Sequence, residues 1–147
     1  MLESLLCNCK IVKVMDSQVA GTTDPTSDIV DTQGYNGSLW ICKLGTVVDA
    51  GAVTLRIQQN IINSASGMAV LSGASAAIAV TSSDSEQSLI VDVVKSRERY
   101  LRAEVVRDTQ NSEIDAIYCI LYNPCNMAVS QPDTIDASTL VVSPAEA

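Results

Sequence analysis

Cysteine thiols are the first groups of this sequence that could carry chemistry. The five cysteines, which offer thiolates for a metal ion, are Cys7, Cys9, Cys42, Cys119 and Cys125. The paired C-x₂-C spacing of zinc ribbons is absent, and Cys42 and Cys119 lie in apolar runs, where a free cysteine behaves as a small hydrophobic side chain. Their odd number and irregular spacing do not fit the disulfide framework of a secreted domain. We therefore predict no metal site and no cofactor.

Carboxylates are plentiful, so chance pairing could imitate the acid and base of a glycosidase. Most of them stand beside Ser, Thr, Asn or Gly in segments expected to be loops, which is typical of solvated turn residues. Calcium held between acidic loops is an alternative, although no Asp-x-Asp-x-Asp-Gly loop is present. The carboxylates concerned are Asp24, Asp28, Asp31, Asp84, Glu86, Asp92, Glu98, Glu104, Asp108, Glu113 and Asp115.

Histidine is missing altogether, which removes the usual general base near neutral pH and the commonest neutral metal ligand. The serine-rich stretches at 64–75 and 82–88 contain no Gly-x-Ser-x-Gly elbow and no neighbour that would activate a nucleophile. The glycine-containing turns lack the Gly-x-Gly-x-x-Gly fingerprint of a nucleotide site. We therefore expect a protein that binds other molecules and is not an enzyme.

The charge balance points away from nucleic acid and membranes. Nine basic and 17 acidic residues give a net charge of −8, which repels phosphate backbones and anionic headgroups. No stretch approaches the roughly 20 apolar residues that span a bilayer. Residues 1–13 lack the pattern of a signal peptide, so we expect synthesis and assembly in a cytoplasm.

Positive charge is concentrated in one place, around Tyr100. The cluster consists of Lys95, Arg97, Arg99, Arg102 and Arg107. We expect these residues to pair with the abundant acids, within a sheet or across a subunit boundary. Arg and Tyr side by side favour a protein interface.

The elements that would position these groups are short β-strands. Residues 52–58, 88–94 and 100–107 alternate between two faces with the period of a half-buried strand. Residues 38–45 and 114–122 are almost continuously apolar, and 8–14 and 27–31 are shorter β-prone runs. About seven or eight strands with no sustained helical period predict one all-β domain, a β-sandwich or jelly roll.

The remaining segments are expected to be loops and arms. Residues 15–27 predict a loop, and 60–81, rich in Ala, Ser and Gly, predict a long loop with one weak strand at 76–80. We divide the chain into an N-terminal arm at 1–9, a sandwich at 10–124 and a C-terminal arm at 125–147. An arm that cannot fold alone usually needs a neighbour.

A series of short motifs, in order along nearly the whole chain, resembles a group of small tailed-bacteriophage proteins associated with head decoration or cement. The motifs are Asn-Cys-Lys-Ile-Val-Lys-Val-Met-Asp at 8–16, Ala-Gly-Thr-Thr-Asp at 20–24, Val-Asp-Thr-Gln-Gly-Tyr at 30–35, Leu-Arg-Ile-Gln-Gln at 55–59, Val-Asp-Val-Val at 91–94, Arg-Tyr-Leu-Arg-Ala at 99–103 and Val-Ser-Pro-Ala-Glu at 142–146. The resemblance implies a jelly-roll subunit, a dimer or trimer, clamped over joints between major capsid proteins. Residues 60–79 depart from the group by having little aromatic or acidic content.

The leading hypothesis is therefore a virion structural protein on the outer capsid surface that bridges adjacent major capsid proteins. We expect its contacts at the two arms and at the basic cluster. The predicted interface residues are Leu2, Leu5, Leu6, Arg99, Tyr100, Arg102, Leu140, Val141, Val142 and Pro144. One alternative is a carbohydrate-binding sandwich on the virion surface or tail, stacking sugars on Trp40 or Tyr35, although we expect Trp40 to be buried. Another is a hydrolase with carboxylates clustered in a pocket.

Overall fold

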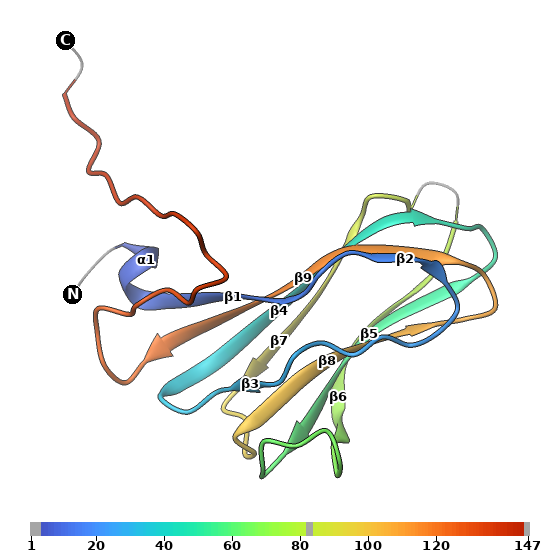
Figure 1. Ribbon diagram of the computed structural model, residues 1–147, viewed down its shortest axis with the longest axis horizontal. Coiled ribbons are helices and arrows are strands. Elements are labelled where there is room, and N and C mark those ends of the chain that lie inside the picture. The colour runs from blue at the N-terminus through green and yellow to red at the C-terminus, as the bar shows by residue number, and fades with distance from the viewer. Residues whose placement is uncertain (1–3, 82–83, 146–147) are drawn as a thin grey trace.

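A computed structural model describes residues 4–81 and 84–145 of the chain. It confirms the predicted all-β sandwich, because two antiparallel sheets pack against each other and the single helix of the described residues, α1 (Leu5–Asn8), is one turn long (Figure 1). Within these residues the structure contains no helix long and apolar enough to cross a membrane.

The first sheet, called sheet A below, has the order β1-β9-β4-β7. Its strands are β1 (Cys9–Met15), β9 (Ser112–Pro124), β4 (Tyr35–Val47) and β7 (Ser88–Val94), and β2 (Gln18–Gly21) also pairs with β9. Sheet B has the order β3-β8-β5-β6, with β3 (Val30–Asp31), β8 (Tyr100–Arg107), β5 (Ala52–Asn60) and β6 (Ala69–Ala79). In sheet A the first strand, β1, lies beside the last strand, β9. Two packed four-stranded sheets with this strand order form a jelly roll.

The core lies between the sheets and is built from alternate residues of each strand. On β4, for example, Trp40, Cys42 and Leu44 are fully buried. The Trp40 indole N–H donates a 3.0 Å hydrogen bond to Ser38 Oγ, so its polar atom is satisfied inside the core. Burying each large apolar side chain stabilises the fold by roughly 1.5–3 kcal/mol. The largest buried side chains also include Leu55, Ile57, Leu101, Ile114, Ile117 and Leu121.

Two predicted loops contain strands that the sequence analysis missed. The predicted loop at 15–27 is wrong at β2, whose four residues pair with the start of β9. The predicted weak strand at 76–80 is part of β6, which is 11 residues long and pairs with β5 from Ala52 to Gln59. The register shifts within β6, and Gly73 there has a φ of +81°. Only glycine adopts that backbone readily, so this residue allows the bulge.

Arg107, the last residue of β8, connects several chain segments at one end of the sandwich. Its side chain is buried, and its guanidinium donates to the carbonyl oxygens of Val19, Thr23 and Ser112. Its backbone N–H donates to Asp24 Oδ1 at 2.8 Å. Burial of a charged group requires such partners. Arg107 therefore ties the β2 segment to both β8 and β9.

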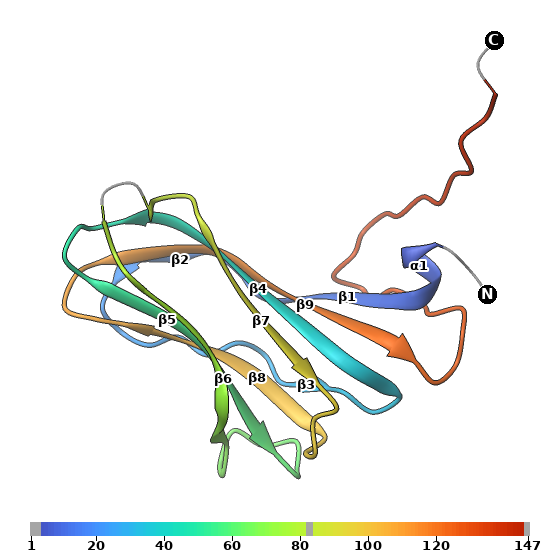
Figure 2. The same cartoon turned by 180° about the vertical axis from the view of Figure 1, so that it is seen from behind.

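Helix α1 and the segment that follows β9 lie together at the other end of the sandwich (Figure 1 and Figure 2). The Val129 N–H donates to the Cys7 carbonyl at 3.1 Å, and the Gln131 amide group donates to the carbonyls of Leu6 and Cys9. Gln131 Oε1 accepts a 2.9 Å hydrogen bond from the Ile11 N–H. Residues 129–131 therefore cover part of the free edge of β1, and residues 136–145 then extend away from the domain (Figure 1).

Candidate interaction surface

Sheet A has a second apolar surface, on the side that faces away from the core. Residues directly opposite each other on antiparallel strands project to the same side of the sheet. The register places Ile120 of β9 between Ile11 of β1 and Leu39 of β4. The residues next to them along β9 and β4, Cys119 and Trp40, point into the core. This row therefore lies on the outside.

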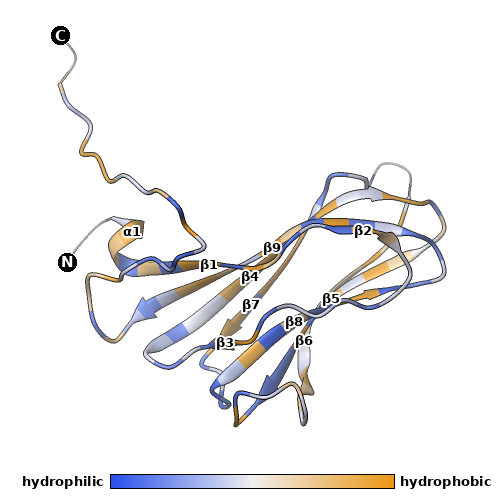
Figure 3. Cartoon of the chain, in the orientation of Figure 1, coloured by the Kyte–Doolittle hydropathy of each residue, from blue (hydrophilic) through white to orange (hydrophobic). Residues whose placement is uncertain are grey.

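The adjacent row extends the same surface across all four strands. Tyr118 lies between Lys13 of β1 and Ile41 of β4, and Ile41 is opposite Ile90 of β7. Ile90 is 54% exposed and Tyr118 is 36% exposed, whereas the inner members are half-buried by their neighbours. β7 is drawn largely in the hydrophobic colour in Figure 3. We call this surface the apolar face and define it by Ile11, Leu39, Ile41, Ile90, Tyr118 and Ile120.

One end of the apolar face is closed by Tyr122 and Asp92. The Tyr122 hydroxyl donates a 2.6 Å hydrogen bond to Asp92 Oδ1. This bond, together with burial, raises the pKa of Tyr122 to about 12, because ionising the phenol would place a negative charge beside the carboxylate. The Tyr122 ring reaches β7 by crossing over Gly37 of β4, where a Cβ would lie 2.1 Å from the ring.

The other end of the apolar face carries an ion-pair group. The Lys43 ammonium donates to Glu86 Oε2 at 2.5 Å and to Asp115 Oδ2 at 2.7 Å. The two carboxylates raise the pKa of Lys43, with the hydrogen bond to Asp115 the larger cause. All three side chains are at least two-fifths exposed, so this group marks a polar rim and contributes little to stability.

The outer face of sheet B is polar by contrast. Arg56 of β5 forms an ion pair with Glu104 of β8, and Gln58 donates to the same carboxylate at 3.1 Å. Arg102 donates to Gln58 Oε1 at 2.6 Å. The two outward surfaces of the sandwich therefore differ in kind: sheet B presents a hydrogen-bonded charge network and sheet A presents branched and aromatic side chains.

The predicted basic cluster is divided by the structure. Arg99 forms two hydrogen bonds with Asp31, at 2.8 and 2.7 Å, and its guanidinium carbon lies 5.1 Å from the centre of the Tyr100 ring. The Arg99 hydrogen bonds lower the pKa of Asp31. Arg102 belongs to the sheet B network. Arg107 is buried in the set of hydrogen bonds that ties the β2 segment to β8 and β9, which we call the latch. Arg99 therefore pairs with an acid within sheet B, and Arg107 lies away from the surface.

The predicted contacts in the two arms lie at one end of the molecule, apart from Leu2, which is outside the described residues. Leu5 is 76% exposed and Leu6 is half-buried on α1. In the C-terminal segment, all predicted members are exposed, namely Leu140, Val141, Val142 and Pro144. Arg99 and Cys125, at the root of this segment, line one shallow pocket with Tyr35. The structure therefore brings Arg99 near the start of the C-terminal arm.

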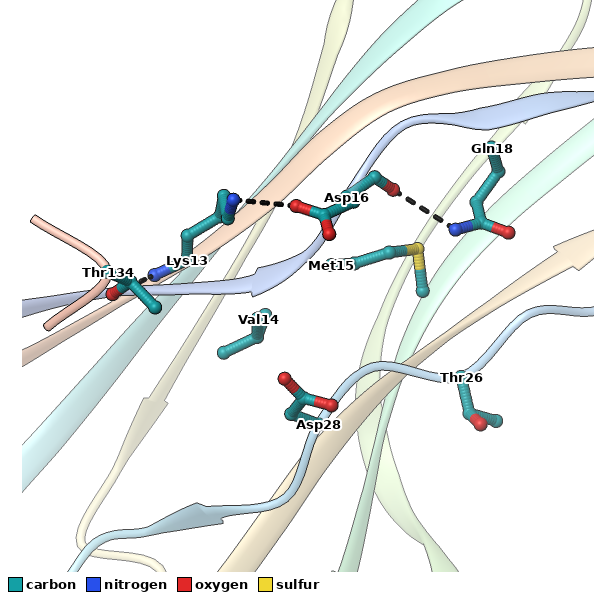
Figure 4. A pocket seen from close by; sticks show the side chains of 8 residues that line it. All are labelled: Lys13, Val14, Met15, Asp16, Gln18, Thr26, Asp28 and Thr134. Carbon is teal, nitrogen blue, oxygen red and sulfur yellow. Dashed lines mark hydrogen bonds and ion pairs between the residues drawn. The ribbon is translucent and has the colours of Figure 1, made fainter.

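A groove of about 350 Å³ runs between β1 and the segment before β3 (Figure 4). Figure 4 shows Val14 and Met15 on β1 facing Thr26 and Asp28 across it. The other carboxylate of its lining, Asp16, is held by Lys13 at 2.6 Å. The groove thus contains an ion pair, the Gln18 amide that donates to the Asp16 carbonyl and the Thr134 hydroxyl that accepts from the Lys13 N–H, and no arrangement of a nucleophile with a base.

The cysteines and Trp40 occupy structural positions. Cys42 and Cys119 are buried in the core, and burial raises the pKa of the Cys42 thiol to about 12. In the part of the chain that the structure describes, no three Cys, Asp or Glu side chains lie close enough to hold a metal ion. Trp40 is 0% exposed, as expected from its apolar run, so it cannot serve as a stacking platform for a sugar.

The apolar face was missed by sequence reasoning, although a signal for it exists. Residues 39–42 and 117–121 are apolar at successive positions, so they place large side chains on both sides of their strand. The first run by itself predicts only a central strand of the sandwich. A strand that is apolar on both faces is typical of a sheet covered on both faces.

Comparisons with known proteins add little to this description. No protein-family model matches the chain, and no curated protein matches it. Among solved structures, the crystal structure of PirA is similar to 79% of this chain and 85% of its own, with 16% sequence identity and a TM-score of 0.34.

Proposed function

We propose that this chain is a decoration or cement protein of a tailed-bacteriophage capsid. It binds the outer surface of the shell and stabilises it by bridging adjacent major capsid proteins. The motif resemblance suggests this setting. The supporting structural observation is the outer part of the C-terminal arm, residues 136–145, which leaves the sandwich with apolar side chains exposed.

The arm has the features of a segment that becomes ordered on a partner. Leu140, Val141 and Val142 are 50%, 76% and 83% exposed, and the described residues beyond Ile135 belong to no helix or strand. An extended apolar segment can add to a sheet edge of another protein, where backbone hydrogen bonds give affinity and alternate side chains fill pockets.

The root of the arm is fixed, so the arm starts from a defined point. Gln131 forms three hydrogen bonds with the backbone around α1 and β1, and the Ile135 N–H donates to the Pro132 carbonyl at 2.9 Å. Fixing one end of a flexible segment lowers the entropy cost of binding its other end. High copy number on a shell would add avidity to each weak contact.

Co-sedimentation with empty capsids that lack this protein tests the proposal. We expect the full chain to sediment with capsids, and the triple variant Leu140→Ser, Val141→Ser, Val142→Ser to bind at least tenfold more weakly. Val19→Ser is the matched control, because Val19 is 86% exposed on β2, at the opposite end of the sandwich. Failure of the full chain to bind capsids, or equal binding by the triple variant, contradicts the proposal. A particle reconstruction then shows whether the bound chain lies on the exterior.

A further inference from the structure

We infer that the apolar face of sheet A is the interface with a second copy of this chain, in a two-fold symmetric dimer. The inference goes beyond the proposed function, because it requires no capsid. It starts from the two central strands. β4 and β9 each carry large apolar side chains on the outside as well as in the core, and no described segment covers Ile41, Tyr118 or Ile90.

The apolar face is large enough for a dimer of moderate affinity. Four strands about 4.8 Å apart and three outward rows about 6.8 Å apart, counting the bordering row of Tyr122 and the exposed Val94 with the two rows of the apolar face, make a surface of roughly 300–400 Å² in plan. Because side chains interdigitate, two such faces bury on the order of 1,000 Å² in total, which is at the lower limit for a specific interface. Two sheets that pack face to face align to within about 30°.

The charges at the edges of the face favour a second copy as the occupant. Lys13 lies in the outward rows at the β1 edge, and Asp92 lies at the β7 edge. A two-fold axis parallel to the strands places the β1 edge of one copy over the β7 edge of the other, so Lys13 of each copy lies across from the edge that carries Asp92 of the other copy, one row apart, and Asp92 can keep its hydrogen bond from Tyr122. Lys13 contacts Asp16 at 2.6 Å in the single chain, but an exposed pair of this kind is weak and can exchange. The face is therefore self-complementary although the whole chain carries a charge of −8.

The dimer also gives the arms a defined geometry. Each arm starts beside β1, and the two-fold axis puts the two β1 strands at opposite sides of the interface. The two arms then leave the dimer in different directions. If the proposed function holds, one dimer reaches two neighbouring capsid proteins, which is what bridging requires.

Sedimentation equilibrium of the full chain at concentrations from about 1 to 200 µM tests the inference. We expect a monomer–dimer equilibrium in the micromolar range, which is weakened at least tenfold by Ile90→Lys. Val70→Lys is the matched control: Val70 is a β-branched residue on edge strand β6 of sheet B and is 47% exposed, close to the exposure of Ile90. Circular dichroism and thermal melting confirm that both variants keep the fold.

The same experiment gives a different result for each alternative to this dimer interface. A chain that stays monomeric throughout this range overturns the inference, as does a trimer. A dimer that tolerates Ile90→Lys but is lost in the triple serine variant of residues 140–142 shows that the arm makes the interface instead. Because no capsid is present, failure here leaves the co-sedimentation result unaffected, and loss of capsid binding leaves the dimer unaffected.

Discussion

Tyr122 on β9 and Asp92 on β7 are joined by a 2.6 Å hydrogen bond although strand β4 lies between their strands. The bond is possible because the intervening residue is Gly37, which leaves the surface of β4 free for the phenol ring. A side chain that spans three strands fixes their relative positions on the outside of sheet A. It also limits the apolar face at that end.

Replacing Gly37 with alanine should destabilise the protein by about 1–3 kcal/mol, because the new Cβ would lie 2.1 Å from the Tyr122 ring and displace it. Urea unfolding followed by the fluorescence of buried Trp40 measures the change. In a Tyr122→Ala background the same substitution should cost much less, since the ring is gone. Equal costs in the two backgrounds would show that the ring does not need the glycine.

The hydrogen bond of Tyr122 should also make stability depend on pH in the alkaline range. The folded-state pKa of about 12 lies above the value of 10.0 for an ordinary tyrosine. The contribution is therefore complete below pH 10 and is lost as the pH rises through 12. The stability difference between the wild type and Tyr122→Phe should shrink between pH 10 and 12 in urea titrations. A constant difference over that range contradicts this assignment.

Arg107→Met should cost about 2–4 kcal/mol, because it removes the donor from the buried Ser112 carbonyl and from the part-buried carbonyls of Val19 and Thr23. Arg107→Lys should recover little, since one ammonium cannot replace the planar fork. Arg102→Met is the control: it lies on the outer face of sheet B and should cost less than about 1 kcal/mol. Chemical denaturation of the three variants ranks them, and similar losses for Arg102→Met and Arg107→Met would disprove the latch.

The cysteines should react with a thiol reagent in two groups at pH 8. Cys125 is exposed and should react within the folded protein. Cys42 and Cys119 should react only on unfolding, because burial shields them and raises their pKa values, that of Cys42 to about 12. Counting modified thiols by mass spectrometry before and after denaturant gives the result, and Cys125→Ser should remove a fast-reacting thiol. Rapid labelling of Cys119 in the folded state would contradict its place in the core.

The sequence predicted the position of a strand well where the residue pattern within that strand was sufficient by itself. β7 and β8 were predicted with the bounds that the structure shows, because each has apolar residues at alternate positions, on the side that faces the core. The outcome for β6 was different. Its Ala, Ser and Gly residues have little intrinsic strand preference. The strand forms because its backbone pairs with that of β5.

The set of strands that share the apolar face could not be found from the sequence for a related reason. Ile120 is 109 positions from Ile11 in the chain, yet they are neighbours through the register of β1 with β9. Periodicity shows which residues of one strand share a side, but it does not show which strands become neighbours. The arm residues 140–142, whose apolar character is local, were recognised as a candidate contact directly from the sequence.

The position of β9 determines when, during synthesis, the apolar face becomes available for binding a second copy. β9 is the last strand within the described residues, but it lies between β1 and β4 in the middle of sheet A. During synthesis the first strands must wait without their main partner until residue 124 has left the ribosome, and pairing between such distant segments is slow. Because the apolar face includes rows from β9, it is completed only with the last strand. A partly made chain therefore lacks the surface through which a finished one would bind its copy.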